Sequence, residues 1–290
     1  MSSQPIPKPI TENEIHLWFL PRAAAEKEKL CRGGAGLLAS DELDRYRSYR
    51  HPTRAKQFQL GRILMRRSLA AHLAMNPGEL QFSYGLNGKP ELQAAIAGGL
   101  VFSLSHARSS SVMAIAYAER IGVDMEMLSR ASPVLGIARQ FFSAEEMCHI
   151  ESHSETAAEE ALTLWCLKES IVKASGSTIW EGLAKVKLAS HGEHIKWLSA
   201  PLIGAEPTWC LMHGRHYGDY LLALAMQRND VLSQPQKMHI HILGSEANSD
   251  ACFRITGASG SIGSGGRPTR MKHCWPAGRL GNCSQFWRLL

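Results

Sequence analysis

The sequence predicts an α+β protein, and three regions of the chain carry that prediction. The stretch 40–76 is helical in pattern, with an apolar stripe running between many arginines. The stretches 100–104 and 112–117 are typical of two strands joined by the polar turn 107–111. The stretch 156–174 is strongly helical again, and further strand patterns follow it. This mixture of helices with antiparallel strands indicates an α+β architecture.

Local signals set the expected element boundaries. Asn76-Pro77-Gly78 ends the first helical region, because proline and glycine interrupt helices. A third strand is expected at 121–127, and a short helix beyond Pro133 at 135–142. Gly176 is a stop signal for the second long helix. The strands of a closing sheet are expected at 186–189, 195–198, 208–212 and 220–226.

The chain divides into two expected units and a tail. Residues 1–118 and 119–244 each combine helix with antiparallel strand, although no convincing sequence repeat relates them. From 245 to 290 the composition changes to Gly, Ser and Arg without a sustained period. Such a segment buries too little apolar area to offset its ordering entropy. We therefore expect a disordered, dispensable C-terminal tail.

Composition excludes several classes of function. The net charge is +6, but 245–290 contributes +4 of it, so 1–244 offers no general nucleic-acid surface and no nucleic-acid partner is expected. No apolar run approaches the roughly 18 residues of a membrane span, so no membrane partner is expected. The first twenty residues lack the apolar segment of a secretory signal. The seven cysteines form neither a CxxC pair nor a Cys/His group with zinc spacing, which indicates reduced thiols and a cytoplasmic protein.

A pair of carboxylates stands in the third expected strand. The period of two in a strand places Asp124 and Glu126 on one face, while Val123 and Met125 point the other way. Adjacent carboxylates repel each other unless a cation lies between them, and Mg²⁺ is commonly held by one or two carboxylates together with substrate phosphates. The alternative is a half-exposed strand with a solvated acidic face.

The second long helix carries a charged pair. Glu169 and Lys173 are four residues apart on one helical face, with Trp165 one turn before them. Either they form an ordinary surface ion pair, or Glu169 is a metal ligand or general base and Lys173 a counter-charge for phosphate. The segment alone leaves both interpretations open.

Further candidates lie at the end of the first expected strand and in the loop before it. Ser105 and His106 precede a serine-rich turn, which suits hydrogen bonding to a phosphate, although His106 is equally typical of an ordinary turn. Lys89 lies in the loop Gly88-Lys89-Pro90, where an exposed lysine is also common.

Five segments occur together in one order: GKP, FSLSHA, GVDME, FFSAEE and WCLKESIVK. In this combination the chain resembles the Sfp-type 4′-phosphopantetheinyl transferases, whose hallmarks are a G-[IV]-D-x-E strand and a W-x-x-K-E-[AS]-x-x-K helix. The resemblance covers roughly residues 14–230. It implies two similar α+β subdomains packed with pseudo-twofold symmetry, with the coenzyme A site between them.

The resemblance also implies roles for individual residues. A magnesium ion would be held against the pyrophosphate of coenzyme A by Asp124, Glu126 and Glu169. Lys173 would contact the same phosphates, and Lys168 would also bind coenzyme A. The adenosine 3′-phosphate end would be held by Arg45, Lys89, Ser105 and His106. Arg45 stands where many members have lysine, which keeps the charge but changes its geometry.

The implied reaction moves the phosphopantetheine arm of coenzyme A to a serine of an acyl or peptidyl carrier protein. Glu169 would take the proton of that serine, and Lys173 would stabilise the leaving adenosine bisphosphate. A protein of this type is expected to be a monomer. The alternatives are a non-catalytic module that binds coenzyme A or a carrier protein, and a metal-dependent phosphohydrolase.

Overall fold

The computed structural model describes residues 10–20, 34–85, 87–108, 110–191, 194–199, 209–216, 220–228, 237–242, 253–254 and 287–289. The helices are α2 (Ser40–Ser48), α3 (Pro52–Leu73), α4 (Ala94–Ala97), α5 (Ala131–Phe141), α6 (Ala144–Ser152), α7 (Ala157–Ser175) and α8 (Ile179–Lys185). The strands of the first half are β1 (Glu14–Leu20), β2 (Phe82–Tyr84), β3 (Pro90–Leu92), β4 (Leu100–Ala107) and β5 (Ser110–Tyr117). Those that follow are β6 (Arg120–Met127), β7 (Lys187–His191), β8 (His194–Ser199), β9 (Trp209–His216), β10 (Tyr220–Gln227), β11 (Lys237–Ile242), β12 (Phe253–Arg254) and β13 (Trp287–Leu289).

Two main sheets organise the molecule. The first has the strand order β12-β11-β1-β5-β4, and the second has the order β13-β9-β10-β6. The short strands form two separate hairpins, β2-β3 and β7-β8. The α+β class expected from the sequence is confirmed.

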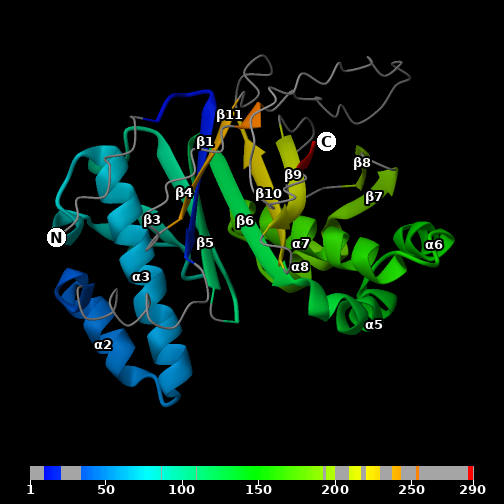
Figure 1. Ribbon diagram of the computed structural model, residues 1–290, viewed down its shortest axis with the longest axis horizontal. Coiled ribbons are helices and arrows are strands. Elements are labelled where there is room, and N and C mark those ends of the chain that lie inside the picture. The colour runs from blue at the N-terminus through cyan, green and yellow to red at the C-terminus, as the bar shows by residue number, and fades with distance from the viewer. Residues whose placement is uncertain are drawn as a thin grey trace, which may run out of the picture.

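The sheets and helices are stacked in layers. Alternate residues of β1, β5, β6 and β10 form an apolar core between the two sheets. The long helix α3 covers the outer face of the first sheet, and α7 with α5 covers the outer face of the second (Figure 1). Strands β5 and β10 are buried on both faces, which explains why they are apolar at nearly every position.

The helical stretch expected at 40–76 is two helices, because Pro52 interrupts it. The residue before a proline is driven away from helical geometry, and His51 is extended with φ −100° and ψ 118°. Pro52 then occupies the first turn of α3, where its missing N–H costs nothing. The chain turns between α2 and α3, and α3 ends at Ala74 in a left-handed conformation.

The C-terminal half returns to the N-terminal sheet. Strand β11 pairs in parallel with β1, with Leu17 opposite Ile240. The sequence analysis did not identify either strand. The expected boundary at 118/119 falls between β5 and β6, but β11 lies in the first sheet although it belongs to the unit 119–244 by sequence. The division into two units and their pseudo-twofold symmetry stay predictions.

The expected tail is described at five residues only. Phe253–Arg254 pairs with β11 and Trp287–Leu289 pairs with β9. The disorder of the tail as a whole stays a prediction. Both segments add to the open edge of an existing sheet, where unpaired backbone groups accept a further strand. The rest of 245–290 lies outside the described residues.

Across the described ranges, no helix combines the length and apolar character needed to cross a membrane.

Candidate active site

Strand β6 presents different chemistry on its two faces. Val123 and Met125 point into the core between the sheets. By the alternation of a strand, Asp124 and Glu126 project toward the opposite face, on which α7 packs. The carboxylate pair predicted from the sequence therefore faces the second long helix.

A glycine allows α7 to approach β6 closely. A Cβ placed on Gly122 would lie 1.8 Å from the carbonyl oxygen of Ser170 and 2.6 Å from the backbone nitrogen of Ala174. No residue with a side chain fits that contact. The glycine before the acidic pair therefore sets the distance at which Glu169 and Lys173 of α7 meet Asp124.

Two serines of β4 connect the first sheet to β6 of the second sheet, next to Asp124. Ser103 Oγ accepts a hydrogen bond from Val123 N–H at 3.1 Å, and Ser105 Oγ accepts one from Met125 N–H at 3.2 Å. These hydroxyls replace a strand ladder between β4 and β6. Ser105 Oγ also donates to Asp124 Oδ1 at 2.9 Å, which fixes the orientation of that carboxylate.

Asp124 is the centre of a buried polar network. Its side chain is almost fully buried, and Lys173 Nζ donates to its Oδ1 at 2.7 Å and to Ser105 Oγ at 2.9 Å. The other oxygen, Oδ2, is buried and has no hydrogen-bond partner of good geometry, although the weakly donating Cys166 thiol lies beside the carboxylate. Leaving a buried carboxylate oxygen unpartnered is costly, so this atom is available to a ligand.

The neighbouring acids repel one another. Burial and the charge of Asp124 raise the pKa of Glu126. The Glu126 carboxylate also forms an ion pair with Arg130, four residues later in the chain. Burial, followed by the charge of Asp124, raises the pKa of Glu169 to about 7. Burial alone would lower the pKa of Lys173, but Asp124 outweighs it, so the ammonium pKa is raised.

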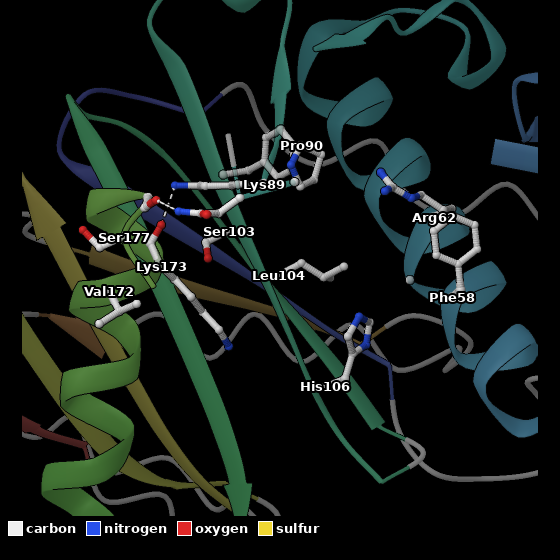
Figure 2. A pocket seen from close by; sticks show the side chains of 15 residues that line it. Phe58, Arg62, Lys89, Pro90, Ser103, Leu104, His106, Val172, Lys173 and Ser177 are labelled. Atoms are coloured by element: carbon white, nitrogen blue, oxygen red, sulfur yellow. Dashed lines mark hydrogen bonds between the residues drawn. The ribbon is translucent and has the colours of Figure 1, made fainter. Parts of the chain in front are cut away.

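A pocket of about 320 Å³ opens beside this network. It lies between α3 and α7, with β4 running behind it (Figure 2). Its volume is within the usual range for small-molecule sites. Its polar or charged lining residues are Arg62, Asn87, Lys89, Ser103, His106, Lys173 and Ser177.

His106 lies at the α3 end of the pocket (Figure 2). Its Nδ1 is 2.8 Å from Ser111 Oγ. A Cβ on Gly61 would lie 2.7 Å from His106 Cε1, so a glycine in α3 is needed for the ring to pack there. Burial, with the charges of Lys173 and Arg62, lowers the pKa of His106 to about 4 and keeps the ring neutral.

The loop before β3 is tied to the second half of the protein. Lys89 Nζ donates to the carbonyl oxygens of Lys173 at 2.8 Å and of Ile121 at 3.3 Å. Asn87 Nδ2 donates to the Gly176 carbonyl at 2.6 Å. Lys89 is thus half-buried rather than an exposed loop lysine, and its ammonium retains one N–H for a further acceptor.

The arginine at the pocket is not the one that the resemblance indicated. Arg45 is exposed on α2, with its guanidinium 5.5 Å from the centre of the Phe58 ring, and it does not line the pocket. Arg62 of α3 does, and it stacks over Phe58 at 5.0 Å and Tyr84 at 5.4 Å. Sequence reasoning missed Arg62, although Phe58 and Arg62 share a helical face at four-residue spacing.

The surroundings of Lys168 indicate a structural role. Its side chain is fully buried on another face of α7, with Nζ 2.8 Å from a Glu146 oxygen and 4.0 Å from the centre of the Phe142 ring. Glu146 also caps the start of α6 through Ser143 N–H. The structure does not bring Lys168 to the pocket, because a one-residue step on a helix turns the side chain by roughly 100° from Glu169.

The donor set fits a hard cation by its chemistry. Mg²⁺ binds carboxylate oxygens and keeps several waters or substrate phosphates as its other ligands. Asp124 supplies a buried, unpartnered oxygen, and Glu126 and Glu169 lie close enough for their charges to interact with it. Among the described residues, these three carboxylates do not form a group whose ligand atoms all lie within 4.8 Å. Phosphate and water oxygens would complete such a site.

The chain is similar in sequence to known proteins. Residues 120–225 match the 4′-phosphopantetheinyl transferase superfamily. The chain is 32% identical to the 4′-phosphopantetheinyl transferase HetI of Nostoc sp., over 71% of this chain and 86% of that protein. It is 31% identical to a putative 4′-phosphopantetheinyl transferase of Synechocystis sp., over 59% of this chain and 68% of that protein. A 4′-phosphopantetheinyl transferase of Bacillus subtilis is 25% identical over 54% of this chain and 66% of its own length.

Proposed function

The chain belongs to the 4′-phosphopantetheinyl transferase superfamily and is a 4′-phosphopantetheinyl transferase; from this premise we propose that it modifies a serine of an apo acyl or peptidyl carrier protein, with Mg²⁺ as cofactor. Coenzyme A is the donor substrate. The observation that carries the proposal is the buried Asp124 carboxylate, which lies beside the pocket with one oxygen unpartnered.

The pocket offers cations to the phosphates of coenzyme A. Lys173 and Lys89 line it on the α7 side, and Arg62 lines it on the α3 side (Figure 2). Their charges lie in a partly dehydrated site, where attraction to a polyanion is stronger than in water. The stacking of Arg62 on Phe58 holds the guanidinium in a fixed orientation.

Glu169 would act as the general base. In the metal-free protein burial and the charge of Asp124 raise the pKa of Glu169 to about 7, so its carboxylate is a stronger base than an ordinary glutamate. In the reaction the serine oxygen of the carrier forms a bond to the β-phosphorus of coenzyme A, and the bond from that phosphorus to the leaving oxygen breaks. Glu169 takes the serine proton, and adenosine 3′,5′-bisphosphate leaves beside Lys173.

Asp124, Glu126 and Glu169 would hold the magnesium ion. When bound, the ion neutralises charge on the pyrophosphate. Ser105 and Lys173 keep Asp124 oriented through its other oxygen, so Oδ2 stays directed away from both partners.

The reaction is tested by intact-mass spectrometry of purified apo carrier proteins after incubation with coenzyme A, Mg²⁺ and this enzyme. We expect a gain of one phosphopantetheine that disappears in a chelator control. If coenzyme A binds but no carrier class gains mass, the proposal is wrong and a binding module is favoured. Loss of phosphate from coenzyme A without a carrier would instead indicate hydrolysis.

Two substitutions separate the proposed roles. Glu169→Gln should lower turnover at least about 100-fold while coenzyme A binding is largely kept, because general-base catalysis contributes on that scale. Asp124→Ala should instead raise the Mg²⁺ concentration needed for coenzyme A binding. Glu155→Gln, at an exposed turn before α7, is the matched control and should behave as wild type. Wild-type turnover of Glu169→Gln would remove Glu169 from the mechanism.

A further inference from the structure

A second group of potential ligands lies away from the pocket, where β11 pairs with β1. His16 of β1 is opposite His239 of β11, and the ring of His241 lies 5.0 Å from that of His16. His72, near the end of α3, packs against the same rings. His72 is ten residues beyond Arg62, roughly 15 Å along the helix axis, so this histidine cluster is separate from the pocket.

The buried histidine at its centre has an unused nitrogen. His16 is 2% exposed, and its Nδ1 lies 2.9 Å from His241 Nε2. The opposite nitrogen, Nε2, is buried and has no hydrogen-bond partner. Burial, followed by the neighbouring histidines, lowers the pKa of His16 to about 2, so the ring is neutral. Native proteins rarely leave such an atom unpartnered.

Two side chains at the surface face this nitrogen. Glu14 Oε2 is 3.9 Å from His16 Nε2, and Glu14 Oε1 is 3.3 Å from His239 Nε2. One ligand atom from each of the three residues lies within 4.8 Å of the other two. Ligand atoms bound to a tetrahedral zinc ion at roughly 2.0–2.2 Å are roughly 3.3–3.6 Å apart, so small side-chain movements would close the site.

We propose that Glu14, His16 and His239 bind a divalent transition-metal ion of the zinc type. Two imidazoles and a carboxylate are ligands that Zn²⁺ prefers, and they leave a fourth position for water. In the tautomer in which His16 donates from Nδ1 to His241, Nε2 of His16 is left as the metal ligand, which is the usual arrangement behind a metal-bound histidine.

His72 is not part of the proposed ligand set. Its Nε2 already accepts a hydrogen bond from the indole Nε1 of Trp18 at 3.0 Å. A metal bound at this nitrogen would have to displace the indole. The other ring nitrogen, Nδ1, is buried without a hydrogen-bond partner, but His72 does not belong to the group that Glu14, His16 and His239 form. Glu14 and His239 are partly exposed, with side-chain accessibilities of 16% and 19%, so an ion can reach them from solvent.

The site would link β11 to β1 within the first sheet. Glu14 and His16 lie on β1, and His239 lies on β11, so one ion would cross-link two strands that are more than 200 residues apart in sequence. An ion that binds the folded chain but not the unfolded chain raises the free energy of unfolding. No spacing pattern predicts this site, because its ligands meet only when β11 pairs with β1.

The test is a Zn²⁺ titration of the full-length, tag-free chain against a chromophoric chelator, with millimolar Mg²⁺ present to occupy the carboxylates of the active site. We expect one tightly bound Zn²⁺ per chain and a higher melting temperature with Zn²⁺. Glu14→Gln and His239→Gln should each weaken Zn²⁺ binding by roughly tenfold or more. His153→Ala, which alters the His149–His153 ring contact at the end of α6, should bind Zn²⁺ as wild type does.

Unchanged affinity in both ligand variants would overturn the proposal, and so would loss of binding in His153→Ala. The absorption spectrum of the wild-type protein with Co²⁺ tests the site without any variant, so the test remains decisive if a variant fails to fold. Co²⁺ bound in place of zinc should give the strong visible absorption of a tetrahedral site. A weak octahedral spectrum would count against the site.

Discussion

At the scale of single residues, Glu169 couples catalysis to stability. Its folded-state pKa of about 7 lies above the ordinary value of 4.5. The unfolded chain therefore loses this proton at lower pH than the folded chain does, and the ionised carboxylate destabilises the fold as pH rises through this window. The resulting loss in the free energy of unfolding is fully present above about pH 7 and absent well below pH 4.5.

We predict that Glu169→Gln stabilises the metal-free protein at pH 8 by on the order of 2 kcal/mol. The amide keeps the shape of the side chain and removes the charge beside Asp124. At pH 4.5 the two proteins should melt at nearly the same temperature, because Glu169 is protonated in the folded protein and only about half ionised in the unfolded chain. Thermal melts in chelator at both pH values check this. A stabilisation that is equal at both pH values would contradict the pKa assignment.

The structure and the family resemblance give different roles to Lys168. We predict that Lys168→Met destabilises the protein by about 3–5 kcal/mol, because it leaves the Glu146 charge buried and unpaired. Coenzyme A affinity of the folded fraction should be unchanged. Denaturant unfolding and coenzyme A titration, performed on the same preparation, distinguish the two roles. Normal stability combined with weakened coenzyme A binding would restore Lys168 to the binding site.

At the scale of elements, the contact between β6 and α7 assembles the site. We predict that Gly122→Ala destabilises the protein by about 3 kcal/mol or more, because the new methyl group would overlap the backbone of α7 at Ser170. Metal-dependent turnover of the Gly122→Ala variant should also fall, because Asp124 and Glu169 would move apart. Urea unfolding and turnover at several Mg²⁺ concentrations measure both effects.

Gly136 provides the matched control for this substitution. It lies within α5, and a Cβ added there meets no atom within 4 Å. Gly136→Ala should therefore be neutral or stabilise the protein by up to about 1 kcal/mol, as in an open helix position. Equal destabilisation by both alanines would show that the close approach of β6 and α7 is not the cause.

At the scale of the whole molecule, β11 extends the first sheet beyond β1. Its Met238 and Ile240 are buried in the core between the sheets. We predict that a chain ending at Gly244 keeps the fold and the transferase activity, whereas a chain ending at Arg228 is strongly destabilised because it lacks β11. Circular dichroism melts and the carrier mass assay test both truncations. Loss of folding in the longer chain would show that the tail 245–290 is not dispensable.

The sequence predicted the principal elements of the fold because their signals are local. Period-two alternation identified β6 with its acidic face, and helical spacing identified α7 with Glu169 and Lys173. Features without a local signal were missed. The stretch 40–76 lacks an obvious change of period at Pro52, and β11 is a short strand whose identity depends on its partner β1.

By itself, the sequence determined the type of chemistry. Asp124, Glu126 and Glu169 stand in motifs whose residue types and spacings are set within one strand or one helix. Which of the predicted cations line the pocket was decided only by the tertiary structure. Lys168 differs from Glu169 by one step on a helix but faces a buried Glu146, whereas Arg62, which no motif indicated, lines the pocket. The reason is that local periodicity fixes the face of an element, while the packing of one element on another fixes what that face meets.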